Sequence, residues 1–460
     1  MIQPATRGVT ERKLLARLHR LIFLLCMVCI LGAGTRGEAE PALTIVYAGT
    51  VLAIPGREPL RNQSIFVRDG RILELRSGFA AEDGARVIDL RDAFVLPGLI
   101  DLHVHLTTTP SPGGDLADVT KGPADLALLA AVNAERSLAA GFTTVLDLGT
   151  GLRTHEEAVF ALRDAIADGL LPGPRILATG SPLSIPGQSR TTRFRDEVQA
   201  VAGPDNVCTG ADECRRTVRA QVKRGADLIS FYNTGSLLSN PSPAMTFTED
   251  EMLAIVATAH ALGRKVVADG GNTLGDASGI HAALRAGADS IDTVTYPDEE
   301  TWRLLQAGGA YFVPHLYAVQ AAVGDTPGTL QDGTMGWLPL PILEFLYRLK
   351  QETPSAVAAW RANVRFAFGS DPGVFPHGDN AREFAELVGI GMKPGEAILT
   401  ATTAAAGMLG RSADIGTLEP GKAADLIAVS GSPLEDIREL ERVQFVMKGG
   451  MVFRNHLGKR

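Results

Sequence analysis

The sequence has little of several features that define particular classes of protein. Only four of its 460 residues are cysteine. The apolar run from Leu21 to Ala33 has 13 residues, which is too short to span a bilayer comfortably. No Gly-x-Gly-x-x-Gly phosphate loop is present, and its absence disfavours a doubly wound open sheet. The remaining composition, 45% hydrophobic and 21% charged, is that of an ordinary globular protein.

The N-terminal segment differs from the rest of the chain. Basic residues precede the apolar run, and Gly37-Glu38-Ala39 offers small residues at the −3 and −1 positions of a cleavage site. This order predicts a secretory signal peptide over residues 1–39. The protein is therefore expected to be exported, to the periplasm or the extracellular space, with no stable membrane span after cleavage. An uncleaved anchor is the alternative.

The net charge of the chain argues against one class of binding partner. The whole chain carries −8, and residues 1–39 carry +4, so the mature part carries −12. An acidic protein is a poor ligand for nucleic acid. We expect a small-molecule or short-peptide substrate and no nucleic acid, and a homo-oligomer is left open.

Two cysteines remain after signal removal. Cys208 and Cys214 lie six positions apart in a polar stretch. In an oxidising compartment such a pair is expected to form a disulfide. A zinc pair is the alternative, although no second cysteine pair exists to complete it.

His103 and His105 form the most informative motif. They lie in the apolar stretch Leu99–Leu106, directly after Pro97-Gly98, which predicts a buried strand. Residues i and i+2 of a strand point to the same face, so both imidazoles leave the strand together. Neutral imidazoles side by side suit a metal ion. Two hydrogen-bonded core histidines are the alternative.

Strand-like and helix-like stretches alternate between residues 96 and 411. The eight predicted strands, in chain order, are 99–105, 143–148, 175–179, 227–231, 265–269, 290–293, 311–316 and 365–369. This count predicts an α/β fold of the (β/α)₈ TIM barrel type, with a doubly wound sheet as the rival. Residues 40–95 and 412–460 instead carry short alternating strands, and together they are expected to form one small β-domain.

Several motifs resemble the amidohydrolase superfamily, on its imidazolonepropionase-like and prolidase-like branch. They are Val95–His105, Ala140–Val145, Gly369–Gly373 and Ile415–Leu426, with a weaker match at Gly173–Leu177. The resemblance implies a TIM barrel, a small β-sandwich built from both chain ends, and metal-dependent hydrolysis at the carboxyl ends of the strands.

The resemblance also implies a set of metal ligands. Members of this branch usually bind two metals, and His103, His105 and Asp371 match the ligands of the inner one. The bridging lysine and the two histidines of the outer metal are replaced by Ser230, Asp269 and Thr293. We therefore predict one divalent ion, zinc first and iron or manganese as alternatives, with Asp269 as a fourth ligand or as a group that orients water.

The remaining candidates concern catalysis and substrate. The resemblance assigns Asp371 as the general base, and a simple turn residue is the alternative. His315, Tyr232 and Arg190 are predicted to contact the substrate from loops at the strand ends. The leading hypothesis is hydrolysis of an amide bond by metal-activated water, in a non-standard peptide, an N-acyl amino acid or a cyclic amide. The alternatives are an inactive barrel that binds a ligand or partner, and metal-free chemistry by Asp269, Asp371 and His315.

Overall fold

In this computed structural model, strands from both ends of the chain meet in one sheet. The structure describes residues 43–188, 195, 197–198, 205–235, 245–270, 277–293, 297–351 and 354–457. The sheet order is β14-β13-β12-β4-β1-β2-β3. Its strands are β1 (Thr44–Val51), β2 (Leu60–Arg68), β3 (Arg71–Ser77), β4 (Arg86–Pro97), β12 (Leu426–Val429), β13 (Phe445–Lys448) and β14 (Met451–Asn455).

The β4 strand joins the two ends of the chain. It pairs in parallel with β1 and antiparallel with β12. A bridge between Arg71 and Ala423 also links the start of β3 to the segment before β12. The sheet therefore curls back on itself around a buried apolar core that includes Val46, Ile65, Val95, Leu426 and Phe445.

Seven further short strands, all parallel, lie at the centre of the region between β4 and β12. Three pair in the order β5-β6-β7 and four in the order β11-β10-β9-β8. Their bounds are β5 (Leu99–Val104), β6 (Phe142–Asp147), β7 (Arg175–Ala178), β8 (Ile229–Tyr232), β9 (Val266–Asp269), β10 (Ser290–Asp292) and β11 (Tyr311–Val313). Most of their residues are buried, as expected of parallel strands covered on both faces.

Backbone hydrogen bonds connect the two groups of strands at both sides. On one side, the Asp227 N–H donates to the Ala178 carbonyl, and Leu183 pairs with Phe231. On the other side, the segment 365–371 lies between β11 and β5. Its Phe366 bridges to Phe312, and its Phe368 carbonyl accepts the Leu102 N–H. This segment occupies the place of the eighth barrel strand.

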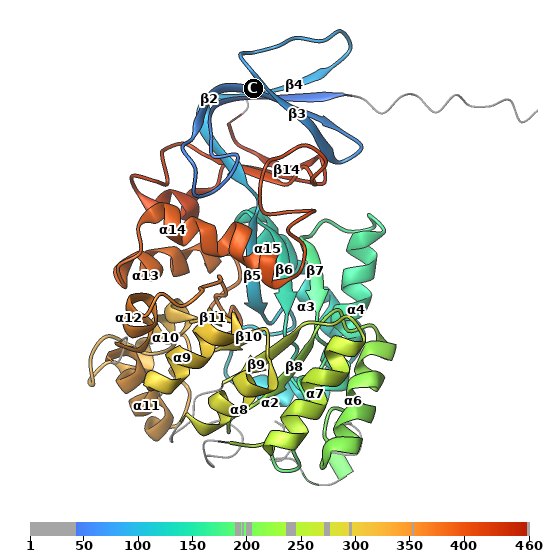
Figure 1. The fold of residues 1–460 in the computed structure, drawn as a ribbon, viewed down its shortest axis with the longest axis vertical. Coiled ribbons are helices and arrows are strands. Elements are labelled where there is room, and N and C mark those ends of the chain that lie inside the picture. Colours follow the sequence, from blue (N-terminus) through green and yellow to red (C-terminus); the bar gives the residue numbers. More distant parts are fainter. Residues whose placement is uncertain are drawn as a thin grey trace, which may run out of the picture. The chain divides into compact units, whose positions relative to one another are not determined.

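Helices surround these strands, as Figure 1 shows. They pack in chain order, with α3 against α4, α6 against α7, and α8 between α7 and α9. The bounds are α2 (Gly114–Thr120), α3 (Pro123–Ala139), α4 (Arg153–Ala167), α6 (Ala211–Arg224), α7 (Glu249–Ala261), α8 (Ser278–Ala286), α9 (Glu299–Gly308), α10 (Leu316–Ala322), α11 (Leu340–Gln351), α12 (Pro354–Arg361), α13 (Glu383–Gly389), α14 (Pro394–Leu399) and α15 (Ala405–Met408).

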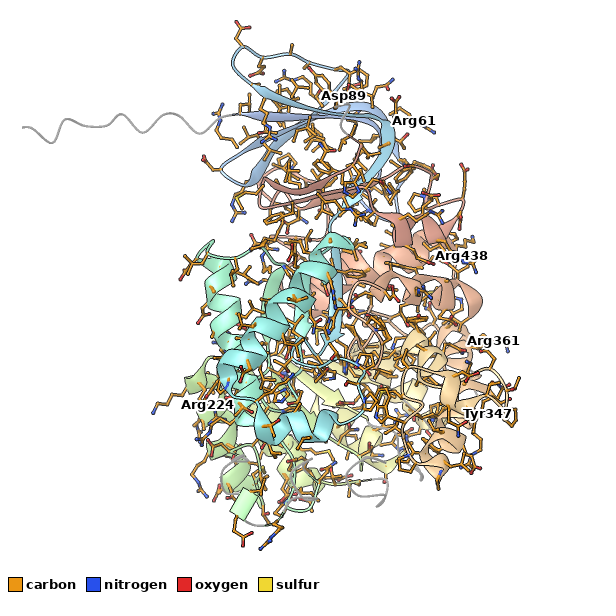
Figure 2. All side chains as sticks on the ribbon, turned by 180° about the vertical axis from the view of Figure 1, so that it is seen from behind. Arg61, Asp89, Arg224, Tyr347, Arg361 and Arg438 are labelled. Atoms are coloured by element: carbon orange, nitrogen blue, oxygen red, sulfur yellow. A yellow bond between two sulfur atoms is a disulfide. The ribbon has the colours of Figure 1, made fainter. Side chains whose placement is uncertain are left out.

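Local sequence explains where several of these helices begin and end. Thr248 and Glu251 form a capping box at the start of α7, and the Asp298 carboxylate accepts the Thr301 N–H at the start of α9. Gly225 ends α6 with a left-handed backbone. The additional helices α11 and α12 follow β11, and Tyr347 and Arg361 mark them on one side of Figure 2, opposite Arg224 of α6.

The predicted alternation of strands and helices is confirmed, with one difference. Residues 365–369 were expected to form a regular strand, but only Phe366 makes a bridge there. Phe368 instead donates its N–H to the Thr400 carbonyl, outside the barrel strands. The disulfide between Cys208 and Cys214 is confirmed, with 5.1 Å between the Cα atoms. Within the part of the chain that the structure describes, none of the helices combines the length and apolarity needed to cross a membrane.

Candidate metal centre

The β5 strand delivers His103 and His105 to the same end of the barrel. All six residues of β5 are buried, so the strand has little freedom to rotate. The buried Asp101 carboxylate accepts the His103 N–H, and it also accepts the amide and hydroxyl of Ser370. The His103 side chain is only 4% exposed, whereas the His105 side chain is 22% exposed.

Asp371 reaches the same point from the segment after the eighth-strand position. Its N–H donates to the His103 carbonyl at 2.9 Å. Gly369 allows this close approach, because a Cβ there would lie 2.5 Å from Val313 Cγ1 and 3.0 Å from His103 Cβ. Asp371 itself has a left-handed backbone with φ of 63°, which turns its side chain back over β5.

Three ligand atoms form a compact triangle. Nε2 of His103 lies 3.2 Å from Nε2 of His105 and 3.7 Å from Oδ1 of Asp371. Nε2 of His105 lies 3.4 Å from the same oxygen. These edges match the spacing of ligands that each lie about 2.0–2.2 Å from one ion. Oδ1 of Asp371 is buried and accepts no hydrogen bond from any described residue, and the Nε2 atoms of His103 and His105 are its ion-pair neighbours.

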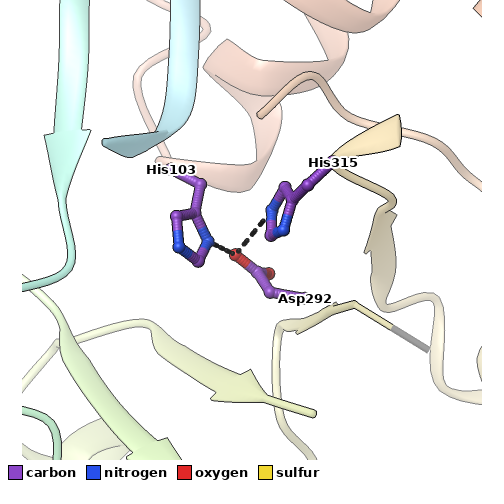
Figure 3. A group of neighbouring side chains, drawn as sticks. All are labelled: His103, Asp292 and His315. Atoms are coloured by element: carbon purple, nitrogen blue, oxygen red, sulfur yellow. Dashed lines mark hydrogen bonds and ion pairs between the residues drawn. The ribbon is translucent and has the colours of Figure 1, made fainter. Parts of the chain in front are cut away.

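Asp292 contacts the Nδ1 side of the His103 ring, which is not part of the triangle. The Nδ1–H of His103 donates to Oδ2 of Asp292 at 2.9 Å, as Figure 3 shows. The Ser290 hydroxyl donates to the other oxygen of Asp292 at 3.0 Å. This carboxylate–histidine pair fixes the ring so that Nε2 faces His105 and Asp371. Asp292 was not among the residues predicted from the sequence, although its period-2 spacing from Ser290 on a buried strand indicates an inward side chain.

The carboxylates around the triangle control its charge. Burial lowers the pKa of His103, but Asp292, Asp371 and Asp269 outweigh it and raise the pKa to about 9. Burial raises the pKa of Asp371 to about 7, against the lowering effect of His103. The apoprotein therefore holds a proton on His103 where a cation would otherwise carry the positive charge.

His315 lies beside the triangle rather than at the rim. Its ring centroid is 4.0 Å from that of His103, and the side chain is 4% exposed. A hydrogen bond of 2.8 Å joins its Nδ1 to Oγ1 of Thr293. Its Nε2 is buried without a hydrogen bond among the described residues and lies 3.8 Å from Oδ2 of Asp292. Burial and the charges of the two neighbouring histidines lower its pKa well below 6.5.

Hydroxyl groups occupy two of the positions expected to bind an outer metal. The Ser230 hydroxyl on β8 donates to Oγ1 of Thr179 at 2.9 Å, and Thr293 bonds His315. Asp269 ends β9 and raises the pKa of both His103 and Asp371 through its charge. It belongs to neither group of adjacent candidate ligands, which are His103, His105 and Asp371, and His103, Asp292 and His315. Its role as a ligand stays a prediction.

Three residues at successive strand ends share an unusual backbone. Thr293, His315 and Asp371 have φ values of 56°, 50° and 63°. A left-handed backbone is costly for a threonine and persists only where the surrounding structure imposes it. All three side chains lie at the triangle or next to it, so the strain is concentrated at the candidate site.

The other predicted substrate contacts have different outcomes. Tyr232 ends β8 and is half-buried. Its N–H donates to the Leu183 carbonyl, and its own carbonyl accepts the Thr246 hydroxyl. Arg190 lies outside the described residues. Both assignments stay predictions.

Comparison with known proteins gives the class of this fold and site. Residues 94–452 match the Amidohydrolase family. The chain belongs to this family. Sequence identity to ochratoxinase from Aspergillus niger is 32% over 459 aligned positions, which cover 90% of this chain and 87% of that protein. An imidazolonepropionase from Salinispora arenicola is 26% identical over 80% of this chain and 85% of its own length.

Solved structures agree with this assignment. A Xaa-Pro dipeptidase with bound methionine in the active site superposes with a TM-score of 0.80 and 32% identity, and the match covers 90% of this chain and all of the dipeptidase. The predicted barrel with a small β-domain is therefore confirmed, as is the resemblance to the imidazolonepropionase-like and prolidase-like branch. The protein is a hydrolase of carbon–nitrogen bonds.

Proposed function

We propose that this protein hydrolyses an amide bond with one divalent ion, held by His103, His105 and Asp371. The observation that carries the proposal is the triangle of Nε2, Nε2 and Oδ1 atoms with edges of 3.2 to 3.7 Å. Two imidazole nitrogens and one carboxylate oxygen form a donor set that suits zinc and leaves positions open for water and substrate. Iron and manganese are the alternatives.

The residues around the triangle fit a metal site better than a pair of hydrogen-bonded core histidines. Asp292 keeps the Nδ1 proton on His103 and directs Nε2 toward the triangle. Oδ1 of Asp371 is buried without a hydrogen bond among the described residues, and a buried carboxylate needs a positive charge nearby. Protonated His103, 3.7 Å away, supplies that charge in the apoprotein, and a divalent ion would supply it in the loaded protein. A divalent ion there would supply Lewis-acid polarisation of the amide carbonyl and would lower the pKa of water.

The protein's own side chains then handle the proton and the substrate. Asp371 would accept a proton from the attacking water and return it to the leaving nitrogen. His315 has a neutral imidazole 4.0 Å, centroid to centroid, from His103. Its Nε2, which makes no hydrogen bond among the described residues, would contact the substrate's polar group. Asp269 adds negative charge near the site and would orient water or bind the ion.

The relatives guide the choice of substrate class. One is a Xaa-Pro dipeptidase whose structure contains methionine in the active site, and another is an ochratoxinase. We propose that the substrate here is an N-acyl amino acid or a dipeptide, in which hydrolysis releases a free amino acid. Cyclic amides are the second class to test.

Metal content tests the proposal directly. The protein spanning residues 40–460 would be purified without chelators and analysed for elements, followed by assays on N-acyl amino acids and dipeptides. We expect about one ion per chain. His103→Ala should abolish metal uptake and hydrolysis, because it removes one of the three ligands. His260→Ala is the matched control, since His260 lies on α7 in an exposed ion pair with Asp289, and it should retain both.

The other outcomes lead to different conclusions. Two ions per chain would contradict the single-ion site and require ligands such as Asp269 and His315 for the second. No ion, even after incubation with zinc, iron or manganese, would support a barrel that binds a ligand without metal catalysis. The replacement of three outer-site ligands by Ser230, Asp269 and Thr293 favours that second candidate over metal-free chemistry.

We also propose that the protein acts outside the cytoplasm. The buried Cys208–Cys214 disulfide supports this, because disulfides are rare in reducing compartments. N-terminal sequencing of protein from the culture medium and periplasm would test it. A mature chain that begins at Glu40 is the expected result, and an intact N-terminus in the cytoplasm would contradict the proposal.

A further inference from the structure

An apolar pocket opens directly beside the candidate metal centre. It has about 600 Å³ of empty space, including the part open to solvent. Its polar boundary is Asp371, His315 and Thr293, and its remaining walls are Ala318, Val319, Met335, Leu338, Ile342 and Leu346, with Ala322 and Val374. The pocket is therefore polar where it meets the metal ligands and apolar everywhere else.

The apolar wall has its own packed support. Buried Ala322, Val323, Leu330, Leu343 and Leu346 form a small hydrophobic cluster between α10 and α11. The Thr334 hydroxyl donates to the carbonyls of Ala321 and Val374, which ties α10 to the segment after Asp371. Lys350 donates to the carbonyls of Gln320 and Val323 and fixes the end of α10 to α11. Packing and hydrogen bonds therefore hold the walls of the pocket in place.

A buried carboxylate positions the start of this wall. Both oxygens of Glu383 accept backbone N–H groups at the first turn of α10, from Leu316 at 3.0 Å and Tyr317 at 2.6 Å. His315 directly precedes that turn. The histidine beside the metal centre and the alanines that line the pocket are therefore held by the same contact.

We propose that this pocket binds a bulky apolar side chain on the amine half of the substrate. The inference rests on the proposed function, because it uses Asp371 as the group that returns a proton to the leaving nitrogen. That nitrogen must approach the Asp371 carboxylate, and Asp371 lines the pocket together with the apolar residues of α10 and α11. The substituent on the nitrogen would enter the pocket, so the preferred substrates are N-acyl derivatives of amino acids such as phenylalanine, leucine and methionine.

Variants on α10 test the pocket with a matched control. Ala318→Leu places extra carbon atoms in the pocket, whereas Ala321→Leu makes the same change on the same helix at a residue that does not line it. The ligands are N-acetyl-phenylalanine, N-acetyl-alanine and N-hexanoyl-alanine, with the zinc-loaded protein. Both kcat/KM and the dissociation constant by calorimetry are measured. We expect the wild type to prefer phenylalanine over alanine by ~30-fold, as apolar burial of the larger side chain predicts.

The expected pattern is specific to the variant and to the half of the substrate. Ala318→Leu should reduce the phenylalanine preference by ~10-fold or more, and Ala321→Leu should leave it unchanged. If Ala318→Leu fails to fold, Ile342→Ala replaces it and should weaken phenylalanine binding by enlarging the pocket. A preference that follows the acyl chain, or that Ala318→Leu and Ile342→Ala leave unchanged, would overturn the inference.

Failure of this inference can be told apart from failure of the proposed function. Hydrolysis with one bound ion but without a phenylalanine preference would contradict only the pocket assignment. A binding preference that depends on Ala318, in a protein that takes up no ion and hydrolyses nothing, would contradict only the metal-dependent hydrolysis.

Discussion

His103 and Asp292 are joined by a buried hydrogen bond of 2.9 Å between Nδ1 and Oδ2, although 189 positions separate them in the sequence. The bond leaves Nε2 of His103 as the nitrogen that faces His105 and Asp371. One carboxylate thereby selects the tautomer and the orientation of the most deeply buried candidate ligand.

Replacing Asp292 should weaken metal binding without removing a ligand. In Asp292→Ala the Nδ1 proton of His103 loses its acceptor, and we expect zinc affinity to fall by ~10–100-fold. Asp292→Asn keeps an acceptor oxygen and should fall less. Competition with a chromogenic chelator measures both. Equal affinity in the wild type and Asp292→Ala would show that Asp292 does not orient the site.

Gly369 sets the distance between Asp371 and β5. In Gly369→Ala the new methyl group would lie 2.5 Å from Val313 Cγ1 and 3.0 Å from His103 Cβ, so the segment must move away from His103. We expect destabilisation of about 1–3 kcal/mol in chemical denaturation, as is typical of overpacking, together with weaker metal binding. Gly389→Ala is the control, because a Cβ at this helical position meets nothing within 4 Å. It should be neutral or slightly stabilising.

The stability of the fold should depend on the ionisation of Asp147. Burial raises the pKa of this carboxyl from 3.8 to about 6, although the N–H groups of Leu106 and Gly149 lower it. Between these two pKa values the folded state binds more protons than the unfolded state. The stability that the group contributes is therefore complete below pH 4 and is lost as the pH rises through 6, by about 3 kcal/mol in total.

A variant isolates this contribution from those of other carboxylates. Asp147→Asn cannot titrate, so the difference in free energy of unfolding between wild type and variant should decrease as the pH rises from 4 to 7. Urea denaturation at several pH values measures it. A difference that stays constant over this interval would mean that Asp147 has an ordinary pKa.

The disulfide should stabilise the loop that it closes. Cys208 and Cys214 are six positions apart, and a loop of this size predicts a stabilisation of about 2 kcal/mol. The double variant Cys208→Ala and Cys214→Ala should unfold at lower denaturant than the wild type by that amount. Reductant should lower the stability of the wild type toward that of the variant and leave the variant unchanged. A wild type that is insensitive to reductant would contradict the prediction.

Much of the fold could be predicted from local patterns. Short apolar runs alternating with amphipathic stretches gave seven of the eight strand positions, because burial on both faces leaves a continuous apolar signal. The segment 365–369 was less regular than expected. Gly369 and Ser370 there serve close packing and hydrogen bonding to β5, which strand propensity does not report.

Residues of the candidate site could be predicted only where they belong to a recognisable sequence motif. His103 and His105 could be assigned to one face from their spacing, and Asp371 from its resemblance to a family motif. Asp292 was missed although its spacing from Ser290 on a buried strand indicates an inward side chain, because that spacing does not identify His103 as its partner. Glu383 was missed because a carboxylate in a mixed stretch has no local signal that distinguishes a buried residue from a surface residue. His315 was expected among the substrate contacts, but its packing against His103 could not be expected from Val313-Pro314-His315.

The sequence by itself determined the barrel class, the paired imidazoles and the disulfide pair, since each depends on periodicity or on the spacing of a few neighbouring residues. Only the tertiary structure decided which carboxylate holds His103, how far apart the three candidate ligand atoms lie, and that Asp371 lines an apolar pocket. Those features depend on distances between residues that lie far apart in the chain. Such distances are set by the packing of β5, β10, β11 and the segment after Gly369, and no local pattern records them.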